Sequence, residues 1–208
     1  MTGRFVSFEG LDGAGKTTQL TMAAVSLAAE GIPYVMTREP GGTEVGLCLR
    51  RELLSDSNDL DPSQELILYQ ADRVLHVSKV IKPAIQAGIW VLCDRFIDST
   101  MAYQGFGRGC PLSPIKTANQ IATGGIVPDL TVLLDMNPEA MRGRLMHRQR
   151  DRVEREDESF FQRVREGFLK IAAWEPERFM VIDAGLDSVI ISAQIAKRLK
   201  ILALGASP

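Results

Sequence analysis

The stretch that decides the fold is Phe8-Glu9-Gly10-Leu11-Asp12-Gly13-Ala14-Gly15-Lys16-Thr17-Thr18. It matches the phosphate-binding pattern Gly-x-x-x-x-Gly-Lys-[Ser/Thr], which lies between a strand and a helix. Its glycines let backbone N–H groups converge on phosphate oxygens, an approach that a Cβ atom would obstruct. The helix that follows adds the positive end of its dipole. The stretch therefore predicts a nucleoside triphosphate site near the amino terminus.

Each position of this loop has an expected part in binding ATP. Lys16 supplies a positive charge for the β- and γ-phosphates, and Thr17 offers its hydroxyl to Mg²⁺. Asp12 is anomalous there, because a carboxylate repels the phosphates of ATP. The expected ATP-binding residues are Gly10, Leu11, Asp12, Gly13, Ala14, Gly15, Lys16, Thr17 and Thr18.

Composition bounds the class of protein. The chain has 208 residues, 45% of them hydrophobic, which suits one domain spanning residues 1–208. A net charge of −2 provides no general attraction for nucleic acid, and no apolar run is long enough to cross a membrane. The three cysteines form no CxxC pair, which is typical of reduced thiols. We therefore expect a cytoplasmic protein that binds neither nucleic acid nor membrane.

Short apolar runs alternate with longer helical patterns. Five buried strands separated by helices predict an α/β fold, with a parallel sheet covered on both faces and a ligand at the carboxyl ends of its strands. The expected strands are residues 5–8, 34–36, 90–93, 130–134 and 179–182. The expected helices are residues 17–30, 45–54, 62–86 with a kink at Pro83, 117–122, 138–148, 159–173 with Ser159 as N-cap, and 188–202.

Charged residues close the third and fourth expected strands. Asp94 could hold Mg²⁺ or its water ligands, and Arg95 could clamp a phosphate with two hydrogen bonds. The alternative is a structural ion pair. Asp135 ends the next strand and is a rival metal holder, which ranks lower because no arginine follows it.

Residues 142–155 contain six arginines. One interpretation is a solvated helix face with pairs such as Arg150–Glu154 and Arg152–Glu156. The other is a mobile lid that closes arginines over a transferring phosphoryl group. The sequence leaves both interpretations open.

The residues favour a phosphate as the group that accepts the phosphoryl. Transfer to a hydroxyl usually requires a base, and no nucleophile–base constellation is evident. A phosphomonoester is already mostly dianionic at neutral pH, so cations are needed instead. This pattern predicts a nucleoside monophosphate kinase. A GTPase would normally carry an Asn-Lys-x-Asp segment, which this sequence lacks.

Further motifs resemble the bacterial thymidylate kinase family. They are Thr37-Arg38-Glu39-Pro40-Gly41-Gly42, Asp94-Arg95-Phe96, Ala102-Tyr103-Gln104-Gly105 and Asp151-Arg152-Val153-Glu154, in the family's order. The resemblance implies a P-loop NTPase fold like that of nucleoside monophosphate kinases, with a five-stranded parallel sheet and a short arginine-rich lid at about residues 142–157. It also implies a homodimer that uses ATP and Mg²⁺ to convert dTMP to dTDP for dTTP biosynthesis.

The resemblance assigns base and sugar contacts to matching positions. Tyr69 would stack on thymine, where the family more often has Phe, and Arg73 would read the edge of the base. The alternatives are a core tyrosine and a surface ion pair of Arg73 with Asp72 or Glu65. Thr100 would face the base. Tyr103 would crowd the sugar C2′, with Gln104 beside it.

The resemblance also assigns the phosphate contacts. Arg95 would hold the acceptor phosphate, with Arg50 and Glu39 near the same pocket. Asp12 would act on the acceptor side, near the dTMP 3′-hydroxyl and the metal, which accounts for a carboxylate in the loop. Relatives with an arginine at the position of Gly13 lack the lid arginine, so Arg152 would supply the transition-state cation here. The expected catalytic residues are Lys16, Arg95, Arg152 and Asp12.

Overall fold

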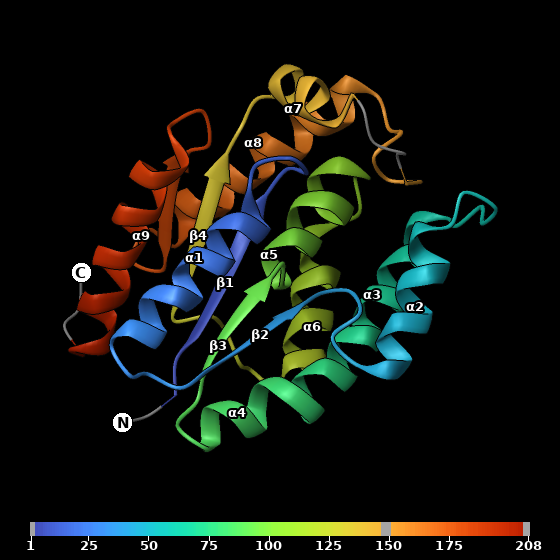
Figure 1. Ribbon diagram of the computed structural model, residues 1–208. Helices are drawn as coiled ribbons and strands as arrows, with labels where there is room; N and C mark the ends of the chain where they lie inside the picture. Colours follow the sequence, from blue (N-terminus) through green and yellow to red (C-terminus); the bar gives the residue numbers. More distant parts are fainter. Residues whose placement is uncertain (1–2, 147–150, 206–208) are drawn as a thin grey trace.

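The structure is a computed structural model that describes residues 3–146 and 151–205. Five strands form one parallel sheet in the order β2-β3-β1-β4-β5 (Figure 1). The predicted α/β fold, a five-stranded parallel sheet flanked by helices, is confirmed. The strands are β1 (Phe5–Gly10), β2 (Tyr34–Arg38), β3 (Trp90–Asp94), β4 (Leu130–Asp135) and β5 (Phe179–Asp183).

Helices cover both faces of this sheet. In Figure 1, α1 and α9 lie together in front of the strands, while α5 and α8 lie behind them. The helices are α1 (Lys16–Ala29), α2 (Glu44–Leu54), α3 (Pro62–His76), α4 (Lys82–Gln86), α5 (Ile97–Thr100), α6 (Leu112–Thr123), α7 (Pro138–Leu145), α8 (Glu158–Trp174) and α9 (Ser188–Ala203), with π-helical η1 (Val77–Ile81) and η2 (Met101–Gly107). None of the described helices combines the length and apolarity needed to cross a membrane.

Burial follows the position of each strand in the sheet. Of the three central strands, β1 is buried throughout, and β3 and β4 are buried except at their last residues, as their unbroken apolar sequences predicted. The expectation of five buried strands is wrong for the two edges. In β2 exposed and half-buried residues alternate, and β5 is exposed at two of its positions, because an edge strand has a neighbour on one side only.

Several predicted helix boundaries need correction. The helix expected at 62–86, with its kink at Pro83, is divided into α3, η1 and α4, and η1 ends two residues before Pro83, because a proline ring cannot fit or donate within a regular helix. The N-cap of α8 is Asp157, whose side chain accepts from the Phe160 N–H; Ser159 lies inside the helix. The helix expected at 117–122 already begins at Leu112. The helix expected at 138–148 ends at Leu145 in the described part, and its last two expected residues lie outside that part.

The strand register brings the carboxyl ends of β1, β2 and β3 together. Phe8 pairs with Asp94, which also pairs with Arg38 of β2. On the other side of β1, Gly10 pairs with Leu134. The phosphate-binding loop and the Asp94-Arg95 pair therefore leave the sheet at the same edge, as expected for carboxyl ends of parallel strands.

Candidate active site

The phosphate-binding loop connects β1 directly to α1. Gly10, Gly13 and Gly15 have positive φ angles of 130°, 77° and 93°, which side chains larger than glycine rarely tolerate. At Gly10 a Cβ atom would also lie 2.3 Å from the Leu134 carbonyl oxygen. Gly10 therefore lets the loop pass directly against β4, while Gly13 and Gly15 permit its turns into α1.

Lys16 is held inside this loop. Its Nζ donates to the carbonyl oxygens of Gly10 at 3.2 Å and Leu11 at 2.9 Å, and it lies 3.6 Å from an Asp12 carboxylate oxygen. Burial and the nearby Arg95 lower the pKa of this ammonium, because both disfavour its charge. A buried cation in this state gains from a phosphate that arrives beside it.

The two residues expected to bind the metal lie together. The Thr17 hydroxyl donates to Asp94 Oδ2 at 2.9 Å, so both oxygens stand at the mouth of the loop. Asp135, the rival metal holder, is instead bound by Arg165 through two hydrogen bonds of 2.7 Å, which occupy both of its oxygens. Asp135 is thus engaged in an ion pair away from the loop, whereas Asp94 lies beside Thr17.

Arg95 connects the loop to η2. Its guanidinium donates to Asp12 at 2.9 Å, to Ser99 at 3.0 Å and to the Tyr103 hydroxyl at 3.2 Å. An ion pair with Asp94 is not the arrangement that is found, because Asp12 is the partner. Arg95 has a φ of 72°, the only positive φ of a non-glycine residue in the described part of the chain. Strain of this kind costs about 1 to 2 kcal/mol and is typical of functional positions.

A buried carboxylate supports the strained turn. Glu9, which is fully buried, accepts from the Phe96 N–H at 2.7 Å and from the Ser99 hydroxyl at 2.5 Å. Burial and the charge of Asp98 raise the pKa of Glu9 to about 8. Glu9 thus fixes the backbone of Phe96, which follows Arg95, and the side chain of Ser99, which accepts a hydrogen bond from Arg95. Neither Glu9 nor Ser99 stood out in the sequence.

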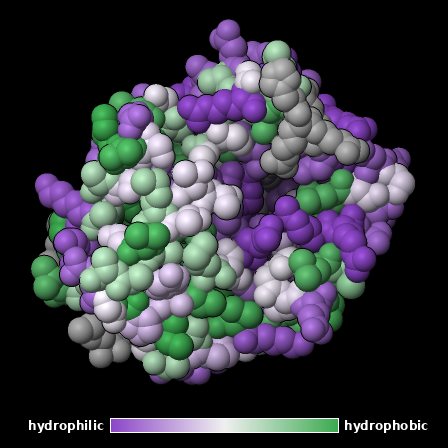
Figure 2. All heavy atoms as spheres, in the orientation of Figure 1, coloured by the Kyte–Doolittle hydropathy of each residue, from purple (hydrophilic) through white to green (hydrophobic). Residues whose placement is uncertain are grey.

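Two pockets open at this edge of the sheet. The loop pocket is lined by residues of the phosphate-binding loop together with Arg38 and Asp94. The side pocket lies between α2, α3 and η2 and contains every residue expected to contact the acceptor: Asp12, Glu39, Arg50, Tyr69, Arg73, Arg95, Thr100, Tyr103 and Gln104. Asp12, Glu39, Arg50 and Arg95 line both pockets, so the two adjoin. Figure 2 shows a hydrophilic hollow on this face of the molecule.

Three residues of the motif do not line the loop pocket. Leu11 and Ala14 are 1% and 2% exposed and belong to the hydrophobic core, and Gly10 packs against β4. The side chains of Leu11 and Ala14 anchor the loop, and Gly10 has none, so any contact of these residues with a nucleotide has to come from the backbone.

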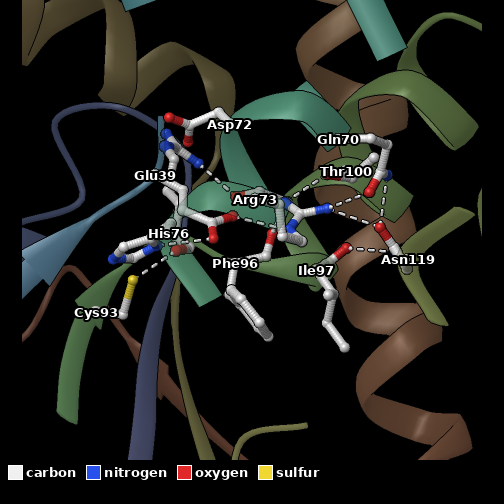
Figure 3. A network of polar contacts seen from close by, with 12 residues as sticks. Glu39, Gln70, Asp72, Arg73, His76, Cys93, Phe96, Ile97, Thr100 and Asn119 are labelled. Carbon is white, nitrogen blue, oxygen red and sulfur yellow. Dashed lines mark hydrogen bonds and ion pairs between the residues drawn. The ribbon is translucent and has the colours of Figure 1, made fainter. Parts of the chain in front are cut away.

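Arg73 is the centre of a buried polar network behind the side pocket (Figure 3). It is 1% exposed and pairs with Glu39 at 2.8 Å, so the alternative of a surface pair with Asp72 or Glu65 is wrong. Its guanidinium lies 5.3 Å from the centre of the Phe96 ring. Every nitrogen donates to protein acceptors: Nε to Glu39, one terminal nitrogen to Gln70 and Asn119, and the other to Thr100 and the Phe96 carbonyl.

Asp72 lies at the other end of this network, and its charge is costly. It is fully buried, accepts from the Gly41 N–H at 3.1 Å, and its Oδ2 has no hydrogen-bond partner among the described residues. Burial and the charge of Glu39 raise the pKa of Asp72 to about 6. Because the pKa is higher in the folded than in the unfolded protein, the folded state binds the extra proton, and stability falls as pH rises from about 4 to 6.

We therefore expect Asp72→Asn to raise the free energy of unfolding by about 1 to 3 kcal/mol at pH 8, where the wild-type carboxylate must be ionised. The gain should shrink below pH 6 and disappear near pH 4. Urea denaturation of both proteins at pH 4, 6 and 8 checks this. A variant that is less stable than wild type at pH 8 would contradict the expectation.

The described part of the lid segment docks on the side pocket. Asp151 and Val153 line that pocket, whereas Arg152 lines neither pocket. Arg152 Nε donates to the Leu53 carbonyl at 3.0 Å, and its terminal nitrogen pairs with Glu65 at 2.5 Å. Glu156 pairs with Arg108, so the expected Arg152–Glu156 pair is wrong; Arg150, of the other expected pair, lies outside the described residues. Residues 151–157 are not helical, which removes the solvated helix face as an interpretation there.

A lid-side arginine that the sequence did not single out contacts the loop. Arg144 of α7 donates to the Gly13 carbonyl at 3.1 Å and to the Ala184 carbonyl at 2.8 Å. It belongs to the arginine-rich segment, but nothing in the sequence distinguished it from its neighbours. Its contacts link α7, the phosphate-binding loop and the turn after β5.

The comparisons with known proteins point to one family. A family model described as thymidylate kinase matches residues 8–195. A thymidylate kinase of Exiguobacterium sibiricum is 45% identical over 199 residues, which cover 95% of this chain and 94% of that protein. One of Synechococcus sp. (strain JA-3-3Ab) is 48% identical over 204 residues, 98% of each chain. The crystal structure of thymidylate kinase from Ehrlichia chaffeensis matches with a TM-score of 0.78 at 35% identity, covering 96% of this chain and 99% of that one.

Proposed function

Because this chain belongs to the thymidylate kinase family, we propose that it transfers the γ-phosphoryl group of ATP to dTMP where its two pockets adjoin. The product is dTDP, and the reaction serves dTTP synthesis. ATP would occupy the loop pocket and dTMP the side pocket. The observation that carries this assignment is that Asp12 and Arg95 line both pockets and contact each other at 2.9 Å.

The residues at the junction suit transfer between two anions. Lys16 would leave its loop carbonyls for the β- and γ-phosphates, and Arg95 would hold the phosphate of dTMP. Arg50 lines both pockets. Burial and the nearby Arg38 lower the pKa of Arg50, because both disfavour its positive charge, and a phosphate beside it would offset them. We assign no base, because the acceptor phosphate is already ionised. Asp12 would orient Arg95 and meet dTMP on the acceptor side.

The oxygen set at the loop mouth fits Mg²⁺. The described residues offer no cluster of three or more His, Cys, Asp or Glu, but Mg²⁺ usually needs only one or two protein oxygens besides phosphates and water. Thr17 and Asp94 would hold it. When bound, the ion would neutralise charge on the β- and γ-phosphates.

The side pocket supplies the base and sugar contacts of the proposal. Tyr69 would stack on thymine, and Thr100 would face its edge. Arg73 would reach that edge only by exchanging one of its present protein acceptors for the base. The Tyr103 ring is 7% exposed and packs edge-on against Phe160 and Phe168, so it is a rigid wall that would exclude a ribose 2′-hydroxyl.

The assignment is tested by steady-state ADP formation from ATP and Mg²⁺ with dTMP, dUMP, UMP, dCMP, dAMP, dGMP or no acceptor. Strong stimulation by dTMP, weaker stimulation by dUMP and almost none by UMP is the expected result. Preference for another monophosphate would mean that the base and sugar contacts are wrongly assigned. ADP formation at the same rate with and without every acceptor would mean ATP hydrolysis and would contradict kinase activity.

Residues 142–157 would act as the lid of one kinase domain spanning 1–208, with Arg152 as the transition-state cation. For this role its side chain has to exchange Glu65 for the transferring phosphoryl group.

We expect Arg152→Ala to lower kcat by about 10²-fold or more and to change the KM for dTMP much less. Arg155→Ala is the matched control, because Arg155 is 54% exposed and pairs only with Asp56 among the described residues. Normal turnover of Arg152→Ala would pass the role to Arg148 or Arg150.

A homodimer is the assembly that we propose. Ile67, Ala71 and Val74 form an exposed stripe on α3, at 66% for Ile67 and 46% for Val74, and Ile121 on the adjacent α6 is 76% exposed. Exposed apolar stripes of this kind mark interfaces. We expect the wild type to have twice the monomer mass by light scattering and Ile67→Glu with Val74→Glu to be monomeric. Val25→Glu, an equally exposed position on α1, is the control. A monomeric wild type would refute the dimer.

A cytoplasmic location completes the proposal. It is supported by the three cysteines, Cys48, Cys93 and Cys110, all of which are free. Free thiols are typical of a reducing compartment.

A further inference from the structure

Glu65 is a buried carboxylate that contacts one residue lining the side pocket, Gln104, and one residue of the lid segment, Arg152. It lies on α3, one helical turn before Tyr69, and is 1% exposed. Its Oε1 accepts from Gln104 Nε2 at 2.6 Å and its Oε2 from Arg152 at 2.5 Å. Arg108 pairs with the same carboxylate at 3.2 Å. No role is assigned to Glu65 by the motifs of the sequence.

These contacts keep Glu65 ionised. Burial alone would raise its pKa, but the charge of Arg108 and the hydrogen bonds from Gln104 and Arg152 outweigh burial, so its pKa lies below its ordinary value. An ionised carboxylate accepts hydrogen bonds and donates none. Arg108 follows η2 and lies outside the lid segment, so Glu65 has one arginine partner besides the lid residue Arg152.

The charge of Glu65 decides how the Gln104 amide is turned. Only the NH₂ end of an amide can donate, so that end has to face Glu65. The carbonyl oxygen of Gln104 is then the end left for the side pocket, and no donor among the described residues contacts it. Gln104 is 3% exposed, so it has little freedom to reorient without losing this bond.

We propose that Glu65 is a specificity-positioning residue, which selects thymine over cytosine by fixing the carbonyl of Gln104 toward the base. Thymine carries a donor, N3–H, between its two carbonyls, whereas N3 of cytosine is an acceptor. A fixed carbonyl accepts from thymine N3–H and faces the lone pair of cytosine N3. A buried polar pair left unmatched in this way lowers kcat/KM by a factor of about 10 to 100. The inference deepens the proposed function and rests on dTMP being the acceptor.

The test is the ratio of kcat/KM for dTMP to that for dCMP in Glu65→Gln. A neutral amide at position 65 can donate as well as accept, so Gln104 is free to turn its NH₂ end toward cytosine N3. We expect kcat/KM for dCMP to rise by about 10-fold and the ratio to fall accordingly. A merely structural residue would lower both values together and leave the ratio unchanged, and that result would overturn the inference.

Three further variants keep the test decisive. In a Gln104→Leu background, Glu65→Gln should change the ratio no further, because the group it positions is gone. Glu156→Gln removes the lid partner of the same Arg108 and should leave the ratio as in wild type. If Glu65→Gln does not fold, Glu65→Asp retains the charge and should keep the wild-type preference for dTMP, while a lost preference would overturn the inference. Wild-type protein that ignores dTMP would instead refute the proposed function.

Discussion

Lys16→Ala is expected to lower kcat for ADP formation by about 10³-fold or more while the protein remains folded. The ammonium sits among loop carbonyls at 2.9 and 3.2 Å, the position from which it can reach phosphates that enter the loop pocket. Fixed cations of this kind act on charge in a site with little water, where each is worth about 10²- to 10³-fold, and Lys16 is the only cation of the loop residues 10–18.

Stability should not fall with activity in this variant. The pKa of Lys16 is lowered by burial and by Arg95, so the folded state pays a cost to keep this charge. Removing it should leave the melting temperature unchanged or slightly higher. Lys200→Ala is the control, because Lys200 is exposed and pairs with Glu30 on the surface. Turnover within 10-fold of wild type in Lys16→Ala would contradict the assignment of the loop to ATP.

Arg95→Gly and Arg95→Ala should be equally inactive but differ in stability, with glycine the more stable. Both lose the guanidinium that bridges Asp12, Ser99 and Tyr103 at the junction of the pockets, so kcat/KM for dTMP should fall by about 10²-fold or more. The φ of 72° is easy for glycine and strained for alanine. Glycine should therefore be more stable than alanine by about 1 kcal/mol, the reverse of their usual order.

This pair of variants separates binding from folding. Kinetics with dTMP and thermal unfolding of both variants are the measurements. An alanine variant that is more stable than the glycine variant would mean that the turn relaxes once the guanidinium is gone. A variant that keeps wild-type kcat/KM would show that Arg95 does not contact the acceptor.

Local patterns were enough to predict the sheet and the loop. Unbroken apolar runs such as residues 90–93 indicate buried strands. The glycines before Lys16 indicate a tight loop, because its backbone needs the positive φ angles that glycine adopts easily. The same patterns did not distinguish edge from central strands. Strand order decides that, and contacts between distant segments decide strand order.

The buried polar residues around the site could not be predicted from local patterns. Glu9 and Glu65 are charged residues at buried positions, which hydrophobic periodicity treats as surface. Their partners lie far along the chain: Ser99 for Glu9, and Gln104 with Arg152 for Glu65. Helix η2 was missed because its glycines oppose a regular helix, although Gly105 allows close packing against α6 and Gly107 against α8. Position in the fold gives these residues their roles.

The central claim is direct transfer of a phosphoryl group between the two pockets. The most direct test follows the label when the protein is incubated with Mg²⁺, dTMP and ATP labelled at the γ-phosphorus, with nucleotides separated by chromatography. We expect the label to appear in dTDP in step with ADP, and both products to form about 10³-fold more slowly, or more slowly still, with Lys16→Ala. Label released only as inorganic phosphate, at a rate that dTMP does not change, would contradict the account.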